Sequence, residues 1–244
     1  MSFSILNESI ESLQEGHIFF SSSGQSKNLP SFDLTLRVTM SSASVRSYLS
    51  IDMGIRNLSC CYATFGASGA IPVIHAWDIL DVLEMCGARC KNCNKLPIQR
   101  ATTLMCDALN MYLSAPNLAG KIDVHGIDRV LIEQQPVGFH RRSNTQMKVL
   151  SHVVQAFFHL RGIPVAFVSP KKKNLLSKEQ SLRDGVASMN TSKRYQWHKK
   201  QSVLRCEEIL ASSSQREFLE FFEGLKKKDD CADSLLNAVA FHNG

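Results

Sequence analysis

Short apolar runs separated by turns mark the first clearly patterned part of the chain. Three of them, rich in β-branched and aromatic side chains, lie at residues 48–54, 57–65 and 71–80. A turn-forming segment at 66–69 separates the last two, so the pattern predicts three strands in an antiparallel meander. Two further strands are predicted, at residues 129–134 and 164–168.

Five other segments show the apolar spacing of an α-helix. They lie at residues 98–113, 143–160, 199–210, 215–225 and 230–242. The order β-β-β-α-β-α-β-α predicts an α/β protein in which helices flank a mixed five-stranded sheet. This is the order of elements in the RNase H-like fold.

The N-terminal segment differs from the rest of the chain. Residues 1–45 are rich in serine and show little periodicity beyond a short helical stretch at 5–13. We therefore predict a poorly ordered N-terminal extension at residues 1–45 and one folded domain at residues 46–244.

Cysteine usage and hydropathy limit the class of protein. The first 20 residues hold three glutamates and no basic segment, so no signal peptide is predicted. Several of the eight cysteines sit inside apolar runs, which favours reduced thiols in an intracellular protein. No run approaches 18 consecutive apolar residues, so no membrane span is predicted.

The net charge of +6 is unevenly distributed along the chain. Residues 1–40 carry two basic and four acidic residues, whereas residues 141–200 carry thirteen Lys and Arg against two acids, a net charge of +11. A segment this basic predicts a surface for a polyanion such as nucleic acid. A solvated basic face without a partner is the alternative.

Acidic residues interrupt the apolar pattern at three places. Asp52 ends the first predicted strand, Glu133 ends the fourth, and Asp229, Asp230 and Asp233 open the last helix. A buried carboxylate without a partner is costly, and a bound cation would offset that cost. A carboxylate cluster supplies the hard oxygen ligands that two Mg²⁺ ions need for phosphodiester hydrolysis. Turn and helix-cap roles are the alternative for each acid taken singly.

Three ordered motifs carry a resemblance to a known family. They are residues 50–59 (SIDMGIRNLS), 132–135 (IEQQ) and 227–236 (KKDDCADSLL). Together they resemble the Holliday junction resolvases of the RuvC-like superfamily, above all the fungal mitochondrial cruciform-cutting endonucleases and then the poxvirus resolvases. The resemblance covers residues 48–242.

The resemblance implies a crossover junction endodeoxyribonuclease that cuts four-way DNA junctions by paired nicks. The acidic tetrad of the family falls on Asp52, Glu133, Asp230 and Asp233, with Asp229 as an auxiliary acid. It also implies two Mg²⁺ ions per active site, for which Mn²⁺ would substitute, and a homodimer that acts in DNA recombination and repair. The fungal likeness points to mitochondria and the poxvirus likeness to a viral DNA-replication compartment.

Basic and amide side chains are candidate DNA contacts. They are Gln134, Gln135, Arg141, Arg142, Lys171, Lys172, Lys173, Lys199, Lys200, Lys227 and Lys228. Lysine and arginine would hold phosphates without reading sequence, so binding should fall steeply with salt. Tyr195 and Trp197 lie among the basic residues, where base stacking and structural packing are both open.

Other functions and one further site are compatible with parts of the pattern. A nuclease for RNA–DNA hybrids would use the same acids, and a junction-binding protein without catalysis would use the same basic surface. Asp52-x-Gly54 also resembles the first phosphate loop of actin-like and sugar-kinase ATPases, but their other nucleotide motifs are not found. Cys86, Cys90 and Cys93 have the spacing of zinc ligands, but no fourth ligand is evident, so no metal is predicted there.

Overall fold

The computed structural model describes residues 45–67, 69, 71–90, 96–115, 122, 124–135, 145–174 and 189–244, which all belong to one compact unit at residues 41–244. The predicted extension at residues 1–45 falls outside these ranges except for Val45, and so do Arg141, Arg142 and Cys93. Within the described part, no helix combines the length and the apolar character needed to cross a membrane.

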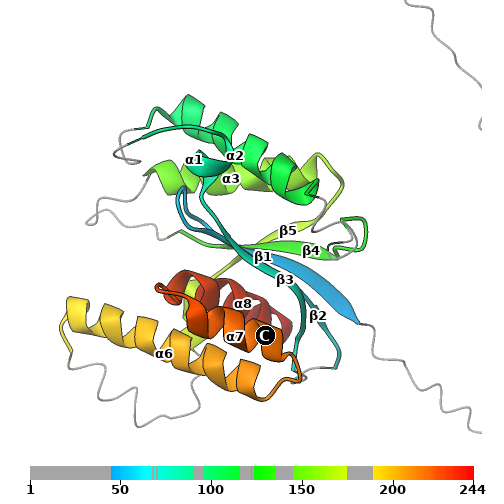
Figure 1. The fold of residues 1–244 in the computed structure, drawn as a ribbon, viewed down its shortest axis with the longest axis vertical. Helices are drawn as coiled ribbons and strands as arrows, with labels where there is room; N and C mark the ends of the chain where they lie inside the picture. Colours follow the sequence, from blue (N-terminus) through cyan, green and yellow to red (C-terminus); the bar gives the residue numbers. More distant parts are fainter. Residues whose placement is uncertain are drawn as a thin grey trace, which may run out of the picture. The chain divides into compact units, whose positions relative to one another are not determined.

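A mixed five-stranded sheet forms the centre of this unit (Figure 1). Its strands are β1 (Arg46–Asp52), β2 (Leu58–Phe65), β3 (Val73–Leu80), β4 (Arg129–Glu133) and β5 (Val165–Val168). The first three strands pair antiparallel, as the predicted meander requires. β4 and β5 extend the sheet in parallel from β1, which gives the order β3-β2-β1-β4-β5. This arrangement confirms the predicted RNase H-like mixed sheet.

Helices cover both faces of the sheet (Figure 1). On one face lie α1 (Val82–Met85), α2 (Ile98–Leu113) and α3 (Thr145–His159). On the other lie α6 (Thr191–Ala211), α7 (Arg216–Gly224) and α8 (Asp229–His242). The short α4 (Pro170–Asn174) follows β5 and contacts α8.

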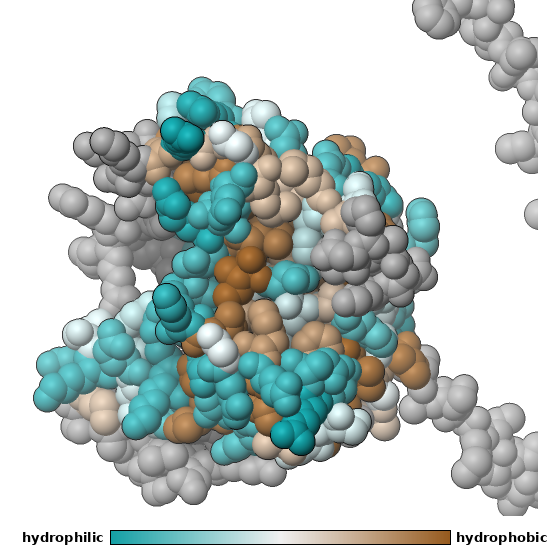
Figure 2. All heavy atoms as spheres, viewed as in Figure 1, coloured by the Kyte–Doolittle hydropathy of each residue, from teal (hydrophilic) through white to brown (hydrophobic). Residues whose placement is uncertain are grey.

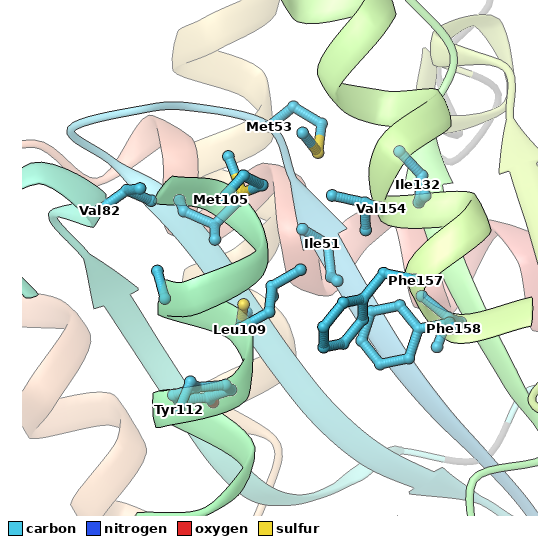
Figure 3. Packing of buried hydrophobic residues seen from close by; sticks show 14 of the residues in the cluster. Ile51, Met53, Val82, Met105, Leu109, Tyr112, Ile132, Val154, Phe157 and Phe158 are labelled. Atoms are coloured by element: carbon cyan, nitrogen blue, oxygen red, sulfur yellow. The ribbon is translucent and has the colours of Figure 1, made fainter. Parts of the chain in front are cut away.

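The alternation of side chains along the strands divides the core into two clusters. Ile51 of β1 and Ile132 of β4 point toward α2 and α3, where Phe157 and Phe158 pack (Figure 3). Successive strand residues point to opposite faces of the sheet. Tyr48 of β1 and Leu131 of β4 therefore point to the other face and pack with α8. Burial of each Leu, Ile or Phe contributes roughly 1.5–3 kcal/mol relative to exposure, so apolar packing holds both helical layers.

Most helices match their predicted ranges. α2 occupies residues 98–113 as predicted, directly after Pro97, and α3, α7 and α8 begin and end within two residues of the predicted positions. The short helices α1 and α4 were not predicted from the pattern. α6 begins at Thr191, eight residues before the predicted start.

The early start of α6 follows from a cap rather than from apolar spacing. The side chain of Asn190 accepts a hydrogen bond from the Lys193 N–H at 2.9 Å, which satisfies one of the free donors of the first turn. Residues 191–196 are all exposed, and the first fully buried residue is Cys206. The start of the helix therefore has no buried apolar residues whose spacing could have predicted it.

Candidate active site

Asp52 and Glu133 lie side by side at one end of the sheet. β1 and β4 run parallel and pair Ile51 with Ile132, so the next residue of each strand falls at the same level. Ile51 and Ile132 point toward α2 and α3, and therefore the two acids point to the opposite face, where α8 lies. Both acids are partly buried. Strand pairing alone thus brings together two of the four predicted ligands.

A tight turn follows Asp52 and leads into β2. A Cβ atom on Gly54 would lie 2.5 Å from the Asn57 carbonyl oxygen, closer than any side chain tolerates. The carbonyl of Ile55 in the same turn accepts a hydrogen bond from the Val82 N–H at 2.9 Å. Glycine at position 54 is therefore required for β1 to end sharply at the acid.

α8 carries the remaining acids and is anchored to the sheet just behind them. Ser234 is fully buried and shares a hydrogen bond of 2.9 Å with Ser59 of β2, and it accepts another of 3.1 Å from the Trp77 indole of β3. Asp229 and Asp230 occupy the first turn, where the helix dipole favours negative charge. These polar anchors, which the sequence pattern did not reveal, fix the acidic end of α8 over β2 and β3.

The buried thiol of Cys231 shows that acids from two elements meet on this face. Burial raises the pKa of Cys231 to about 12, and the charges of Asp230, Asp78 and Asp52 add to the increase. Asp52 comes from β1 and Asp230 from α8, so both carboxylates lie close to this thiol. Asp233 lies toward α6, because its charge raises the pKa of Cys206 on that helix.

Two lysines form ion pairs with the acids that begin α8. Lys199 of α6 donates a hydrogen bond to Asp229, and Lys227 donates one to Asp230 at 2.5 Å. Partial burial alone would lower the pKa of Lys199, but its hydrogen bonds to Asp229 and Tyr195 raise the pKa above the usual value for lysine. The pair of Lys199 and Asp229 joins residues thirty positions apart, and no spacing rule could have predicted it.

The acids fit a divalent cation in their chemistry. Carboxylate oxygens are the ligands that Mg²⁺ prefers, and Asp52 and Glu133 face the same side as the acids of α8. Among the residues that the structure describes, however, no group of three or more His, Cys, Asp or Glu side chains is arranged to hold a metal ion. The backbone therefore places the acids on one face, and their convergence on a metal stays a prediction.

The predicted DNA contacts are spread over several elements. Gln134 and Gln135 follow β4, Lys171 and Lys172 lie on α4, and Lys200 is exposed on α6. The side chain of Gln135 reaches back to the Glu133 carbonyl at 3.5 Å. Lys228 pairs with Glu207 of α6 at 2.9 Å, which gives it a structural role beside α8. Arg141, Arg142 and the side chain of Lys173 lie outside the described residues.

The two described cysteines of the predicted thiol cluster lie beside α1. Cys86 donates a hydrogen bond to the Leu104 carbonyl at 3.4 Å, and the Cys90 carbonyl accepts one from Arg56 at 2.7 Å. Arg56 also donates to Asp81, the residue that caps α1, at 3.2 Å. In the described ranges neither Cys86 nor Cys90 forms a disulfide, and neither belongs to a group suited to a metal ion.

Comparison with protein-family models matches residues 48–193 to the family described as mitochondrial resolvase Ydc2 / RNA splicing MRS1. The match covers more than half of the chain and includes Asp52 and Glu133, but it ends before α8. None of the curated protein sequences compared with the chain matches it.

Three solved structures are similar to the chain at low sequence identity. Yeast mitochondrial Holliday junction resolvase Ydc2 is 15% identical over 81% of this chain and 79% of that chain, with a TM-score of 0.47. Fowlpox virus resolvase with substrate Holliday junction DNA is 17% identical over 80% and 96%, with a TM-score of 0.46. T. thermophilus RuvC with a Holliday junction substrate is 14% identical over 80% and 91%, with a TM-score of 0.41.

Proposed function

Because the chain belongs to the family of mitochondrial resolvase Ydc2 and RNA splicing MRS1, we propose that it is an endonuclease that resolves four-way (Holliday) DNA junctions. The observation that carries this proposal is the pair of Asp52 and Glu133 at the ends of adjacent parallel strands, facing the acidic end of α8. A family that also includes an RNA-splicing protein does not by itself require catalysis. Carboxylates from three elements on one face, beside a basic helix, favour a nuclease over a binding protein.

We assign four carboxylates as the metal ligands: Asp52, Glu133, Asp230 and Asp233. They would hold two Mg²⁺ ions, for which Mn²⁺ would substitute. Bound at these acids, the ions would supply an activated water and would neutralise charge on the leaving oxygen of the phosphodiester. The fold of the chain positions these acids. β1 and β4 set the first pair by register, and the hydrogen bond of Ser234 to Ser59 anchors the helix that carries the second pair to the sheet.

Lys227 links metal binding to DNA binding in this proposal. It is paired with Asp230 at 2.5 Å and lies 3.9 Å from Asp229, while its own side chain is half exposed. Because its side chain is half exposed beside these acids, Lys227 would also hold a DNA phosphate next to the scissile bond. Lys171, Lys172 and Lys200 would hold the arms of the junction through phosphates, without reading their sequence.

The oligomeric state and the cellular location of the protein also follow from the proposed function. Paired nicks in opposing strands require two active sites, so we propose a homodimer. α3 supports this, because Val149 and the nearby Leu160 are exposed apolar residues beside its buried face. The family description names a mitochondrial resolvase, which favours mitochondria over a viral DNA-replication compartment.

The decisive experiment compares the wild-type chain with Asp52→Asn on three substrates and Mg²⁺. The substrates are a synthetic four-way junction, a linear duplex of the same sequence and an RNA–DNA hybrid. We expect symmetric nicks in the junction alone, a loss of at least a hundredfold in rate with Asp52→Asn, and unchanged junction binding. Asp107→Asn, at an exposed position of α2, is the matched control and should cut at the wild-type rate.

Each other result has a definite meaning. Cleavage of the hybrid alone would make the protein a ribonuclease. Binding of the junction without any cleavage would make it a junction-binding protein without catalysis. Equal rates for the wild type and Asp52→Asn would remove Asp52 from the active site.

A further inference from the structure

The N-terminal half of α6 carries an exposed aromatic side chain among cations. Tyr195 is 57% exposed, and residues 191–200 include four Lys and Arg and no acid. Figure 2 shows a hydrophilic surface over this end of the helix. Because nothing in the described core packs on the outer side of Tyr195, structural packing does not account for its ring.

Tyr195 lies one side chain away from the acids that begin α8. Lys199, four residues further along α6, places its ammonium group 5.0 Å from the centre of the Tyr195 ring. The same ammonium group donates a hydrogen bond to Asp229, and Asp230 is the next residue. An exposed aromatic ring and a proposed metal ligand are thus joined through two direct contacts.

Lys199 also gives the ring a defined position. A cation over an aromatic face is attracted by the ring quadrupole, and the lysine is itself held by Asp229. One side of the ring is therefore fixed toward the active site. An exposed side chain that is held in place in this way loses little freedom when it binds a flat partner.

We propose that Tyr195 stacks on a nucleobase that has lost its neighbour at the centre of the junction. This inference rests on the proposed function and names a contact for it. Every nucleobase has a flat face, and proteins that bind unpaired strands combine such aromatic rings with cations that follow the backbone. A continuous duplex offers no free base face, whereas the exchange point of four strands does. Tyr195 thereby distinguishes the centre of the junction from its arms.

The test uses the fluorescent base 2-aminopurine, placed either at the exchange point of a four-way junction or within one arm. The full-length chain is added without metal, so that no cleavage occurs. We expect the wild type to change the emission of the central base and not of the base in the arm. Tyr195→Phe loses the hydroxyl that pairs with Lys199 but keeps the ring, and it should retain the change in emission, whereas Tyr195→Ala should lose it.

Affinity and salt dependence separate stacking from charge. Loss of one stacked base should weaken junction binding by Tyr195→Ala roughly 5- to 150-fold. The slope of log K against log salt should stay unchanged, because no phosphate contact is lost, whereas Lys200→Gln should reduce that slope by about 1. Leu204→Ala, at a 41% exposed position of the same helix, is the matched control and should bind as the wild type.

The outcomes separate this inference from the proposed function. If the wild type binds and cuts junctions while Tyr195→Ala changes neither emission nor affinity, the stacking contact is overturned and the resolvase function stands. If the wild type does not bind junctions, both are overturned. If Tyr195→Ala weakens binding to single-stranded RNA and not to the junction, RNA is the partner of this surface and the proposed DNA contact is overturned.

Discussion

Gln215 forms two hydrogen bonds with the backbone of Ile74 and so covers the outer edge of β3. Its side-chain oxygen accepts from the Ile74 N–H at 2.8 Å, and its side-chain nitrogen donates to the Ile74 carbonyl at 2.6 Å. β3 is an edge strand, whose outward backbone groups would otherwise be a template for another chain. The side chain of Gln215, just before α7, thus forms the two hydrogen bonds that a neighbouring strand would form with Ile74.

Replacement of Gln215 by leucine should therefore weaken the fold and expose the edge. Two backbone groups would lose their partners, and we expect the free energy of unfolding in urea to fall by about 1–3 kcal/mol. Light scattering at high protein concentration should show more association than for the wild type. Gln99→Leu, at an exposed position of α2, is the control and should change neither measurement. Equal stability of the two variants would contradict the role of Gln215.

Asn237 should respond to leucine in the opposite direction. It is fully buried on α8, and among the residues that the structure describes neither its side-chain oxygen nor its nitrogen has a hydrogen-bond partner. A buried polar group without partners costs free energy, whereas an apolar side chain of similar shape does not. We expect Asn237→Leu to raise the free energy of unfolding by about 1–2 kcal/mol. A lower urea midpoint would instead show that the amide has partners in solution.

Lys227 should compete with the metal for Asp230. Its ammonium group lies 2.5 Å from the carboxylate, so Lys227→Met removes both a competitor and a repulsive charge. A change of about 1 kcal/mol in that interaction would lower the Mg²⁺ concentration for half-maximal cleavage roughly fivefold. The neighbouring exposed lysine provides the control, since Lys226→Met should leave the Mg²⁺ requirement unchanged. A higher Mg²⁺ requirement for Lys227→Met would rule out competition.

Four buried thiols should stay unreactive in the folded protein. Burial raises the pKa of Cys231 to about 12, and burial also raises the pKa values of Cys60, Cys61 and Cys206. The thiolate is the reactive form, so these four should react with Ellman's reagent at pH 8 only as the protein unfolds. We expect at most four of the eight cysteines to react rapidly, and all eight in guanidinium chloride. More than four rapid thiols would contradict the burial.

The same thiols give stability a definite pH dependence. A group whose pKa is raised by folding contributes stability that is complete below its unfolded pKa and is lost as the pH rises above it. An unfolded cysteine titrates near about 8.5. The part of the stability that depends on Cys60, Cys61, Cys206 and Cys231 should therefore be constant below about pH 8 and fall above it. Urea unfolding at pH 7 and pH 9.5, repeated with Cys231→Ala, measures the effect.

The strands and the longer helices could be predicted because their residues carry the pattern of a buried face. β1, β2 and β3 read as apolar runs, and α2 shows its spacing over sixteen residues. α1 is too short for a period to appear, and its start depends on the Asp81 cap. Residues 191–196 of α6 are all exposed in the described structure, so no buried face marks the start of this helix. The sequence pattern therefore missed the short helices and the capped start of α6.

The candidate site divides in the same way. Asp52 and Glu133 could be placed together because parallel strands end at the same edge, and Asp230 and Asp233 because they share a helix face. The ion pair of Lys199 with Asp229 depends on how α6 packs against α8, which no local pattern encodes. Lys228 pairs with Glu207 of α6, and its contact with DNA stays a prediction. The sequence thus indicated which acids belong to the candidate site, whereas the packing of the helices determines which lysines pair with them.

The solvent-exposed start of α6 should tolerate amino-acid substitutions during evolution. Residues 191–196 bury no side chain in the described core, and substitutions at surface positions usually alter stability by less than about 0.5 kcal/mol. Mutations there can therefore accumulate without unfolding the chain, whereas changes at Gly54 or Ser234 would disturb the placement of the acids. If Tyr195 contacts DNA as proposed, substrate preference can change through this one helical segment while selection preserves the sheet and α8.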